Sequence, residues 1–189
     1  MIKIGILGDI GSGKSYVAKS FGYPVFNADA EVDKLYSKDK KIFNKLKKVL
    51  PKYINSFPIN KNEISSAILT NNSNLRKIVT IIHLEIKKKM STFLKKNINK
   101  KIIILDVPLL LENKINKKND ILIFIQSKKL DIFKRLKKRK NFNPKLLKKF
   151  QNIQLASNYK KKKSQFIIKN DFTKKSVNKG IKRILKDIL

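Results

Sequence analysis

The sequence predicts a three-layer α/β fold in which five short parallel strands are separated by helices. Two observations carry this prediction. Apolar segments of strand length alternate with amphipathic stretches of helical period, and a glycine-rich loop separates the first strand from the first helix. Parallel strands need crossover connections, which are right-handed and place helices on the faces of the sheet. With 189 residues, 41% of them hydrophobic, the chain can bury the core of one domain.

The predicted strands are short and strongly apolar. The best of them is the β-branched run that ends at Asp106, and Ile121–Ile125 is continuous in the way of a parallel strand buried on both faces. A short buried strand is also expected just before Asn27. The five predicted strands cover residues 2–7, 24–26, 101–106, 121–125 and 166–168.

Helical spacing of apolar residues predicts the segments between the strands. In the helix expected over 127–140, we place Leu130, Phe133 and Leu136 toward the core. The basic stretch 142–149 contains an Asn-Pro pair, which suggests a hinge or mobile cover, with helix resuming through Tyr159. The other predicted helices cover residues 15–21, 39–53, 63–69, 74–96 and the segment from Val177 to Ile188.

The helical stretch 39–97 lies between the second and third predicted strands and is too long for one crossover. We therefore expect an inserted helical subdomain that can close over a substrate. The predicted organisation is one domain over 1–189, with a core of 1–38 and 101–189, an insertion at about 39–100 and a helical lid at about 138–160.

The charge of the chain is extreme but uninformative about function. Lysine and arginine number 46 against 13 acidic residues, a formal net charge of +33 that would attract any polyanion. The cations are spread along nearly the whole chain, and lysine, isoleucine and asparagine dominate together. A genome biased toward A and T explains that trio better than selection for a partner, so we expect no specific nucleic-acid partner.

Composition also bounds the chemistry and the location. Cysteine is absent, which excludes disulfides, thiolate catalysis and cysteine–zinc sites. No apolar run approaches bilayer length, because 102–111 is interrupted by Asp106 and Pro108, so no membrane span is expected. The N-terminus leads directly into strand and glycine loop, which leaves no room for a removable signal. We expect a cytoplasmic protein and a monomer.

The glycine-rich loop Gly8–Ser15 is the strongest motif, because it fits the phosphate-binding pattern G-x-x-x-x-G-K-[ST] at every constrained position. Its glycines let consecutive N–H groups turn inward around a phosphate at a helix N-terminus. Lys14 would reach the β- and γ-phosphates, and the Ser15 hydroxyl would ligate Mg²⁺. A simple glycine turn is the alternative, but the strand before the loop and the helix after it favour a nucleoside triphosphate site. The predicted fold is therefore that of P-loop NTPases.

The loop alone names no reaction, because kinases, GTPases and motor ATPases all carry it. No guanine-reading N-K-x-D tetrad follows an apolar strand, and large ATPases usually exceed this length. A small α/β domain with a helical insertion and a basic, arginine-bearing segment fits a kinase of small metabolites or nucleotides.

Several motifs together resemble one family of such kinases. After the phosphate loop come Asn27-Ala28-Asp29, then His83, then Asp106–Glu112, and this order is similar to that of dephospho-CoA kinases. In that family the second strand ends in D-A-D, a helix of the insertion carries H-P, and the third strand ends in D-x-P-L-L-x-E. The most specific element is Pro108–Glu112, which other small P-loop kinases do not usually carry. The resemblance runs from Met1 to about Asp171 and rests on residues 8–15, 27–29, 83, 106–112, 135–139, 154 and 170.

The resemblance implies an ATP-dependent, Mg²⁺-requiring transfer of the γ-phosphoryl group to the 3′-hydroxyl of dephospho-CoA, the last step of coenzyme A synthesis. Dephospho-CoA is expected to bind between the C-terminal edge of the sheet and the helical insertion. The alternatives are another small-molecule kinase, such as a nucleoside monophosphate kinase, and a basic nucleic-acid-binding P-loop protein.

Two aspartates are the candidate carboxylates. Asp29 aligns with the catalytic base of the family and can accept the proton of the attacking hydroxyl; as an ordinary residue it would cap a helix beginning at Ala30. Asp106 ends an apolar strand, which is the Walker-B arrangement for Mg²⁺, whereas without the P-loop it would be a turn residue. Asn27 replaces the first aspartate of the family motif, so the chain lacks the carboxylate that the resemblance would place there to hold Mg²⁺-bound water.

Two arginines are expected on one helix face. Arg135 and Arg139 are one helical turn apart, and the resemblance places Arg135 at the lid arginine that neutralises the transferring group. A solvated cationic face is the alternative for both.

The remaining candidates follow from the resemblance, and some family positions differ here. His83 is the only histidine and is expected to position the substrate or simply to pack, since Leu84 replaces the proline of the family motif. Ser157-Asn158 stands where the lid helix usually has Arg-Glu, and Tyr16 stands where threonine is usual.

The predicted site residues fall into four groups. The catalytic residues are Asp29, Lys14 and Arg135, and the metal ligands are Ser15 and Asp106. The ATP-binding residues are Gly8, Asp9, Ile10, Gly11, Ser12, Gly13, Lys14, Ser15, Tyr16, Arg139 and Asn170. The substrate-binding residues are His83, Asp106, Pro108, Leu109, Leu110 and Glu112, with an apolar core segment as the alternative for 109–111.

Overall fold

The computed structural model describes residues 1–140 and 142–189; residue 141, within the predicted lid, lies outside the described residues. The chain divides into two compact units. One comprises Met1–Asn27, Asn97–Asn143 and Leu147–Leu189, and the other comprises Ala28–Lys96 with Pro144–Leu146.

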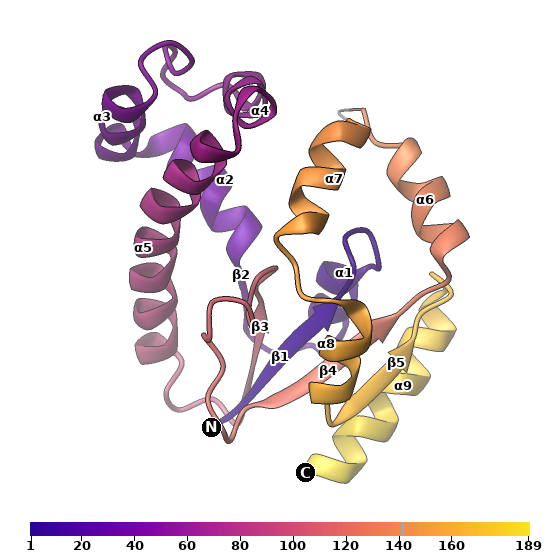
Figure 1. Ribbon diagram of the computed structural model, residues 1–189. Coiled ribbons are helices and arrows are strands. Elements are labelled where there is room, and N and C mark those ends of the chain that lie inside the picture. The colour runs from indigo at the N-terminus through magenta and orange to yellow at the C-terminus, as the bar shows by residue number, and fades with distance from the viewer. Residues whose placement is uncertain (141) are drawn as a thin grey trace. The chain divides into compact units, whose positions relative to one another are not determined.

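The first unit contains the five-stranded sheet, so that prediction is confirmed (Figure 1). The strand order is β2-β3-β1-β4-β5, and every neighbouring pair is parallel. The first strand is central, which places the glycine loop that follows it at the middle of the sheet edge. The strands are β1 (Ile2–Gly8), β2 (Val25–Asn27), β3 (Ile102–Asp106), β4 (Ile121–Gln126) and β5 (Phe166–Lys169).

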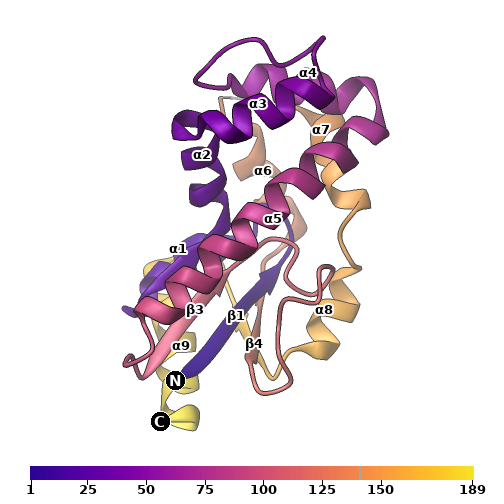
Figure 2. The same cartoon turned by 90° about the vertical axis from the view of Figure 1, so that its left-hand side faces the viewer.

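Helices cover both faces of this sheet, as parallel connections require. Helices α1 and α9 pack together on one face, and α8 packs against β1 and β4 on the other (Figure 2). The helices of this unit are α1 (Lys14–Ser20), α6 (Lys129–Lys137), α8 (Ser157–Lys163) and α9 (Lys174–Ile188). Helix α7 (Pro144–Asn152) belongs to this unit from Leu147 onward.

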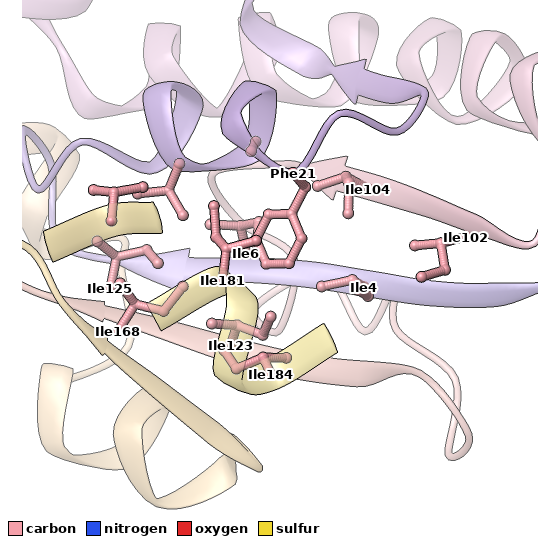
Figure 3. Close-up of a cluster of buried hydrophobic side chains, with 13 residues drawn as sticks. Ile4, Ile6, Phe21, Ile102, Ile104, Ile123, Ile125, Ile168, Ile181 and Ile184 are labelled. Carbon is pink, nitrogen blue, oxygen red and sulfur yellow. The ribbon is translucent and has the colours of Figure 1, made fainter. Parts of the chain in front are cut away.

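The core between the sheet and helices α1 and α9 is built mainly from isoleucine (Figure 3). Ile4 and Ile6 of β1 alternate toward this face, and Ile181 and Ile184 of α9 pack over them. Burying one such side chain contributes about 1.5–3 kcal/mol relative to leaving it exposed. The β-branched runs that predict the strands therefore also supply the packing that holds the phosphate loop on its strand and helix.

The second unit is helical. Helix α5 contacts the three other helices of this unit, and α2 also contacts α3. Side-chain caps define two of the helix starts: the Asp39 carboxylate accepts from Ile42 N at 3.1 Å, and the Asn60 side chain accepts from Asn62 N at 2.9 Å. The helices are α2 (Ala28–Lys38), α3 (Lys40–Val49), α4 (Lys61–Thr70) and α5 (Asn72–Lys96).

The buried face of α6 differs from the predicted one. Leu130 and Phe133 are exposed, at 75% and 48%, so their predicted inward placement is wrong, whereas Leu136 is buried as expected. The inward face is formed by Ile132 and Leu136, which are four residues apart and both approach Gly11 of the phosphate loop. The α6 face is set by this contact with the loop.

The helices of the lid segment also differ from the predicted ones. A helix α7 begins at Pro144, where proline is favoured because the first helical residue needs no N–H partner. It ends at Asn152, and a separate α8 begins only at Ser157. The prediction that helix resumes only after the 142–149 stretch and runs to about Tyr159 is therefore wrong, because most of that stretch is itself helical and the chain leaves the helix at 153–156.

Within the described ranges, no helix has both the length and the apolar character that crossing a bilayer requires.

Candidate functional site

The phosphate loop depends on glycine for its backbone conformation. Gly11 and Gly13 have φ values of 88° and 91°, in the left-handed region that other residues rarely adopt. Gly13 is the N-cap residue of α1, so the loop delivers its N–H groups to a helix N-terminus. The Lys14 ammonium donates to Gly8 O at 3.1 Å and to Asp9 O at 2.8 Å, which keeps this cation over the loop.

Two side chains hold the loop from outside it. The buried Asn170, just past β5, donates from Nδ2 to Ser12 O at 2.9 Å, and Ser127 Oγ donates to the same oxygen at 3.1 Å. The Asn170 carbonyl oxygen in turn accepts from Phe172 N at 2.9 Å. The predicted ATP-binding residue Asn170 thus holds the loop through its amide nitrogen, while its amide oxygen bonds to the turn that follows β5.

Asp106 lies at the predicted place, the carboxyl end of β3, and is almost fully buried. Its Oδ2 accepts from Asn27 Nδ2 at 2.6 Å. The two residues are partners in the parallel pairing of β2 with β3. The asparagine that replaces the family's aspartate therefore meets the Asp106 carboxylate as a hydrogen-bond donor.

Asp29 lies two residues after β2 and inside the first turn of α2. The helix begins at Ala28, not at Ala30, so the interpretation of Asp29 as an N-cap is wrong. A carboxylate in the first turn lies at the positive end of the helix dipole.

The turn after β3 packs against the sheet and also holds a segment that is distant in the sequence. Leu110 is fully buried, and its Cδ2 would lie 2.5 Å from a Cβ on Gly5, so its side chain packs against the sheet. Pro108 and Leu109 are half-buried. Glu112 Oε1 accepts from Leu155 N at 2.8 Å, and within the described residues its buried Oε2 has no hydrogen-bond partner. Glu112 thus ties this turn to the connection between α7 and α8.

The two candidate arginines do not share a helix face. The Arg135 guanidinium lies 4.1 Å from the centre of the Phe172 ring, a stacked cation–π contact. Helix α6 ends at Lys137, and Arg139 lies beyond it, with its N–H bonded to Leu136 O at 3.1 Å. The prediction that Arg135 and Arg139 lie on the same face of one helix is therefore wrong, because the helix ends between them.

The other predicted residues are on helices. Tyr16, in α1, is about half exposed (46%). His83 lies in α5 of the helical unit, and its buried Nε2 makes no hydrogen bond in the part of the chain that the structure describes. Buried polar atoms are normally hydrogen-bonded, so this nitrogen is a candidate for a ligand contact.

A cavity of about 480 Å³ opens beside the phosphate loop and was not predicted. Its lining includes Asp9 and Ile10 of the loop, Leu136 of α6, Gln154, and Lys160 of α8. Lys160 is only 2% exposed. Nothing in the sequence distinguishes it, because it belongs to a run of four lysines, Lys160–Lys163, and only the packing of α8 selects the one that is buried.

Comparisons with known proteins agree along nearly the whole chain. The family model described as CoaE, dephospho-CoA kinase, matches residues 2–176. A protein of Wolbachia sp. subsp. Brugia malayi (strain TRS) named dephospho-CoA kinase is 34% identical over 187 residues, which cover 96% of this chain and 95% of the relative.

Solved structures share the fold. TT1252 from Thermus thermophilus superposes with a TM-score of 0.78 at 20% identity, over 100% of this chain and 98% of that one. Dephospho-CoA kinase from Campylobacter jejuni gives a TM-score of 0.64 at 19% identity, over 98% of this chain and 96% of that one.

Proposed function

The chain belongs to the dephospho-CoA kinase family, and we propose that it transfers the γ-phosphoryl group of ATP to the 3′-hydroxyl of dephospho-CoA. The observation that carries the proposal is the phosphate loop on the central strand together with the buried Asp106 at the end of the neighbouring strand. Phosphoryl transfer depends on positioning and on charge stabilisation. The phosphate loop would position the triphosphate, and Asp106 would help to hold the Mg²⁺ that stabilises its charge.

ATP is the phosphoryl donor that a kinase of this family uses. The backbone of Gly8–Gly13 would surround its phosphates, with the Lys14 ammonium on the β- and γ-phosphates and the Ser15 hydroxyl beside them. Tyr16 would lie next to this cradle. Asn170 supports ATP binding through its hydrogen bond to the Ser12 carbonyl.

Mg²⁺ fits the donor set at this edge of the sheet. Magnesium is usually held by one or two carboxylates, a hydroxyl and substrate phosphates, not by an all-protein cage. Asp106 supplies a buried carboxylate and Ser15 supplies a hydroxyl. Within the described residues, no cluster of three or more His, Cys, Asp or Glu side chains forms an all-protein metal site. When bound with ATP, Mg²⁺ would neutralise charge that develops on the transferring phosphoryl group.

Asp29 is the proposed general base. Its carboxylate would accept the proton of the 3′-hydroxyl as that oxygen attacks phosphorus. Its position in the first turn of α2, two residues from the end of β2, supports this role. The helical unit would bind the acceptor, with the unpartnered Nε2 of His83 as one contact.

The turn Asp106–Glu112 is the proposed acceptor-facing loop. Pro108 and Leu109 are half-buried and accessible to a ligand, and Leu110 supports them from the core. Glu112 supports the arrangement by anchoring the connection that precedes α8.

Arg135, with Arg139 in the lid segment 138–160, would neutralise charge on the triphosphate. The stack of Arg135 on Phe172 supports this role, because it holds a planar cation in a fixed orientation. Closure of the lid would exclude water, which would otherwise hydrolyse ATP. We further propose that the protein acts in the cytoplasm and as a monomer. Light scattering in solution would test whether it is a monomer.

A transfer assay with an acceptor panel tests the proposal. Purified protein with Mg²⁺ and ATP is given dephospho-CoA, a nucleoside monophosphate or no acceptor, and ADP release and acceptor mass are followed. Only dephospho-CoA is expected to gain a phosphoryl group, with its position assigned by phosphorus NMR.

Other outcomes discriminate the alternatives. ATP consumption that is no faster with dephospho-CoA than without it would reject the proposal. Preferential phosphorylation of the monophosphate would support the other small-molecule kinase. Duplex binding that survives near-physiological salt would support the nucleic-acid reading, because diffuse lysine contacts weaken steeply with salt.

A further inference from the structure

The phosphate loop contains a carboxylate that works against its function. Asp9 directly follows Gly8, inside the loop, and its side chain is 37% exposed. A triphosphate bound by the loop would bring several negative charges close to this carboxylate. Two negative charges at such close range repel each other strongly at the intermediate dielectric of a protein surface. The loop can accept a polyphosphate well only if the Asp9 charge is balanced or held away.

Helix α8 meets this carboxylate with a buried cation and a hydroxyl. Lys160 Nζ lies 3.8 Å from Asp9 Oδ1 and 3.1 Å from Gln154 Oε1. The Ser157 hydroxyl donates a hydrogen bond to the same Asp9 oxygen. Ser157 and Lys160 are three residues apart, so both act from one face of α8.

The burial of Lys160 distinguishes it from the other lysines of α8. A lysine that is 2% exposed is rare, because desolvating an ammonium is costly unless it is paired and hydrogen-bonded. The anchoring of the neighbouring connection by Glu112, through Leu155 N, keeps α8 against the loop. Lys162 and Lys163 are exposed and Lys161 is half-buried, and within the described residues none of the three forms an ion pair.

We propose that Lys160 is a positioning residue for ATP binding, which compensates the Asp9 carboxylate and, with Ser157, holds it away from the phosphates. This inference rests on the proposed ATP-dependent function and adds to it a residue that acts through Asp9. It also assigns α8 a role in preparing the phosphate loop before any acceptor binds.

Calorimetric titration of the full chain with MgATP, at about 0.15 M salt and without acceptor, tests the inference. Lys160→Met should weaken MgATP binding by about tenfold, the effect of one unbalanced charge near the phosphates. Lys160→Gln, which keeps hydrogen-bonding capacity, should weaken it similarly, and Lys160→Arg should bind like the wild type. Lys162→Met is the matched control, with the same charge change on the exposed side of α8, and should stay within about twofold because exposed charges are screened.

The double variant Asp9→Asn/Lys160→Met decides between compensation and direct contact. If Lys160 compensates Asp9, removing both charges restores affinity to near the wild-type value. A double variant as weak as Lys160→Met would show that Lys160 binds phosphate directly and would overturn the inference. Equal weakening by Lys162→Met would also overturn it, because the effect would then come from overall charge.

Binding stoichiometry and a second pair of variants distinguish a loss of MgATP affinity from a loss of folded protein. Binding stoichiometry reports the folded fraction, so a Lys160→Met protein that is merely less stable would show fewer sites at unchanged affinity, which would overturn the inference. If that variant does not fold, the comparison of Lys160→Gln with Asp9→Asn/Lys160→Gln answers the same question. Absence of MgATP binding by the wild type would reject the proposed function itself, whereas wild-type binding without transfer to dephospho-CoA would reject only the acceptor.

Discussion

Asn27 donates a hydrogen bond of 2.6 Å to the Asp106 carboxylate, across two neighbouring strands whose ends meet at the candidate site. The pair joins residues that are 79 positions apart in the chain. It leaves Asp106 as a single buried carboxylate with a neutral neighbour, where the family motif would place two carboxylates side by side.

Asn27→Asp should destabilise the protein in the absence of Mg²⁺. The change removes the donor and sets two carboxylates against each other in a buried position, at a cost of about 1–3 kcal/mol. Mg²⁺ should recover part of this loss, because a divalent cation binds two carboxylates better than one. Thermal unfolding with EDTA and with Mg²⁺ measures both effects. A loss of stability that Mg²⁺ leaves unchanged would show that this edge of the sheet does not hold the metal.

Gly13→Ala should cost more stability than Gly22→Ala and should abolish ATP binding. Both glycines have positive φ, 91° and 74°, so each alanine variant pays the left-handed penalty of about 1–2 kcal/mol. A Cβ on Gly13 would also lie 2.5 Å from Asn170 Nδ2, whereas a Cβ on Gly22 meets nothing within 4 Å. We expect a total of about 2–5 kcal/mol for Gly13→Ala, measured by urea unfolding.

Gly22→Ala serves as the matched control for that experiment, because it shares the backbone strain without the contact. It should keep MgATP affinity unchanged in a calorimetric titration. Equal destabilisation by the two variants would mean that the loop tolerates displacement of Asn170.

Asp29→Asn should lower turnover by about 10²–10⁴-fold while MgATP affinity stays nearly unchanged, because a general base acts only in the transition state. Asp33→Asn is the control: it lies four residues along the same helix, is exposed, and pairs with Lys61 at 2.7 Å. It should keep nearly full turnover. Steady-state kinetics of both variants give the comparison, and wild-type turnover in Asp29→Asn would remove Asp29 from the catalytic set.

The pKa of Asp171 is lowered from 3.8 to about 2, chiefly by the hydrogen bond from the Ser176 hydroxyl and also by bonds from Thr173. A depressed carboxylate pKa stabilises the folded state above the unfolded value, and the stabilisation is lost as the pH falls through the folded value. Ser176→Ala should therefore raise the Asp171 pKa toward 3.8. Carbon-detected NMR titration of the Asp171 carboxyl measures this directly, and an unchanged midpoint would show that Ser176 is not the main cause.

The strands and the phosphate loop could be read from the sequence because their signals are local. Continuous β-branched runs such as Ile102–Leu105 predict buried parallel strands, and the spacing of Gly8, Gly13 and Lys14 depends only on the chemistry of one turn. The sequence pattern does not predict the start of α2 at Ala28 or the end of α6 at Lys137, because helix boundaries depend on contacts beyond the local pattern.

By itself, the sequence determined the fold class, the five strands, the nucleotide loop and the resemblance to a kinase family. Only the tertiary structure decided which side chains meet: Asn27 with Asp106, Asn170 with Ser12 over 158 positions, and Lys160 with Asp9. These pairs arise from strand register and from the packing of helices on the sheet. One residue in a run of lysines becomes a buried partner of the phosphate loop because the fold places it there, and no periodicity in the chain records that choice.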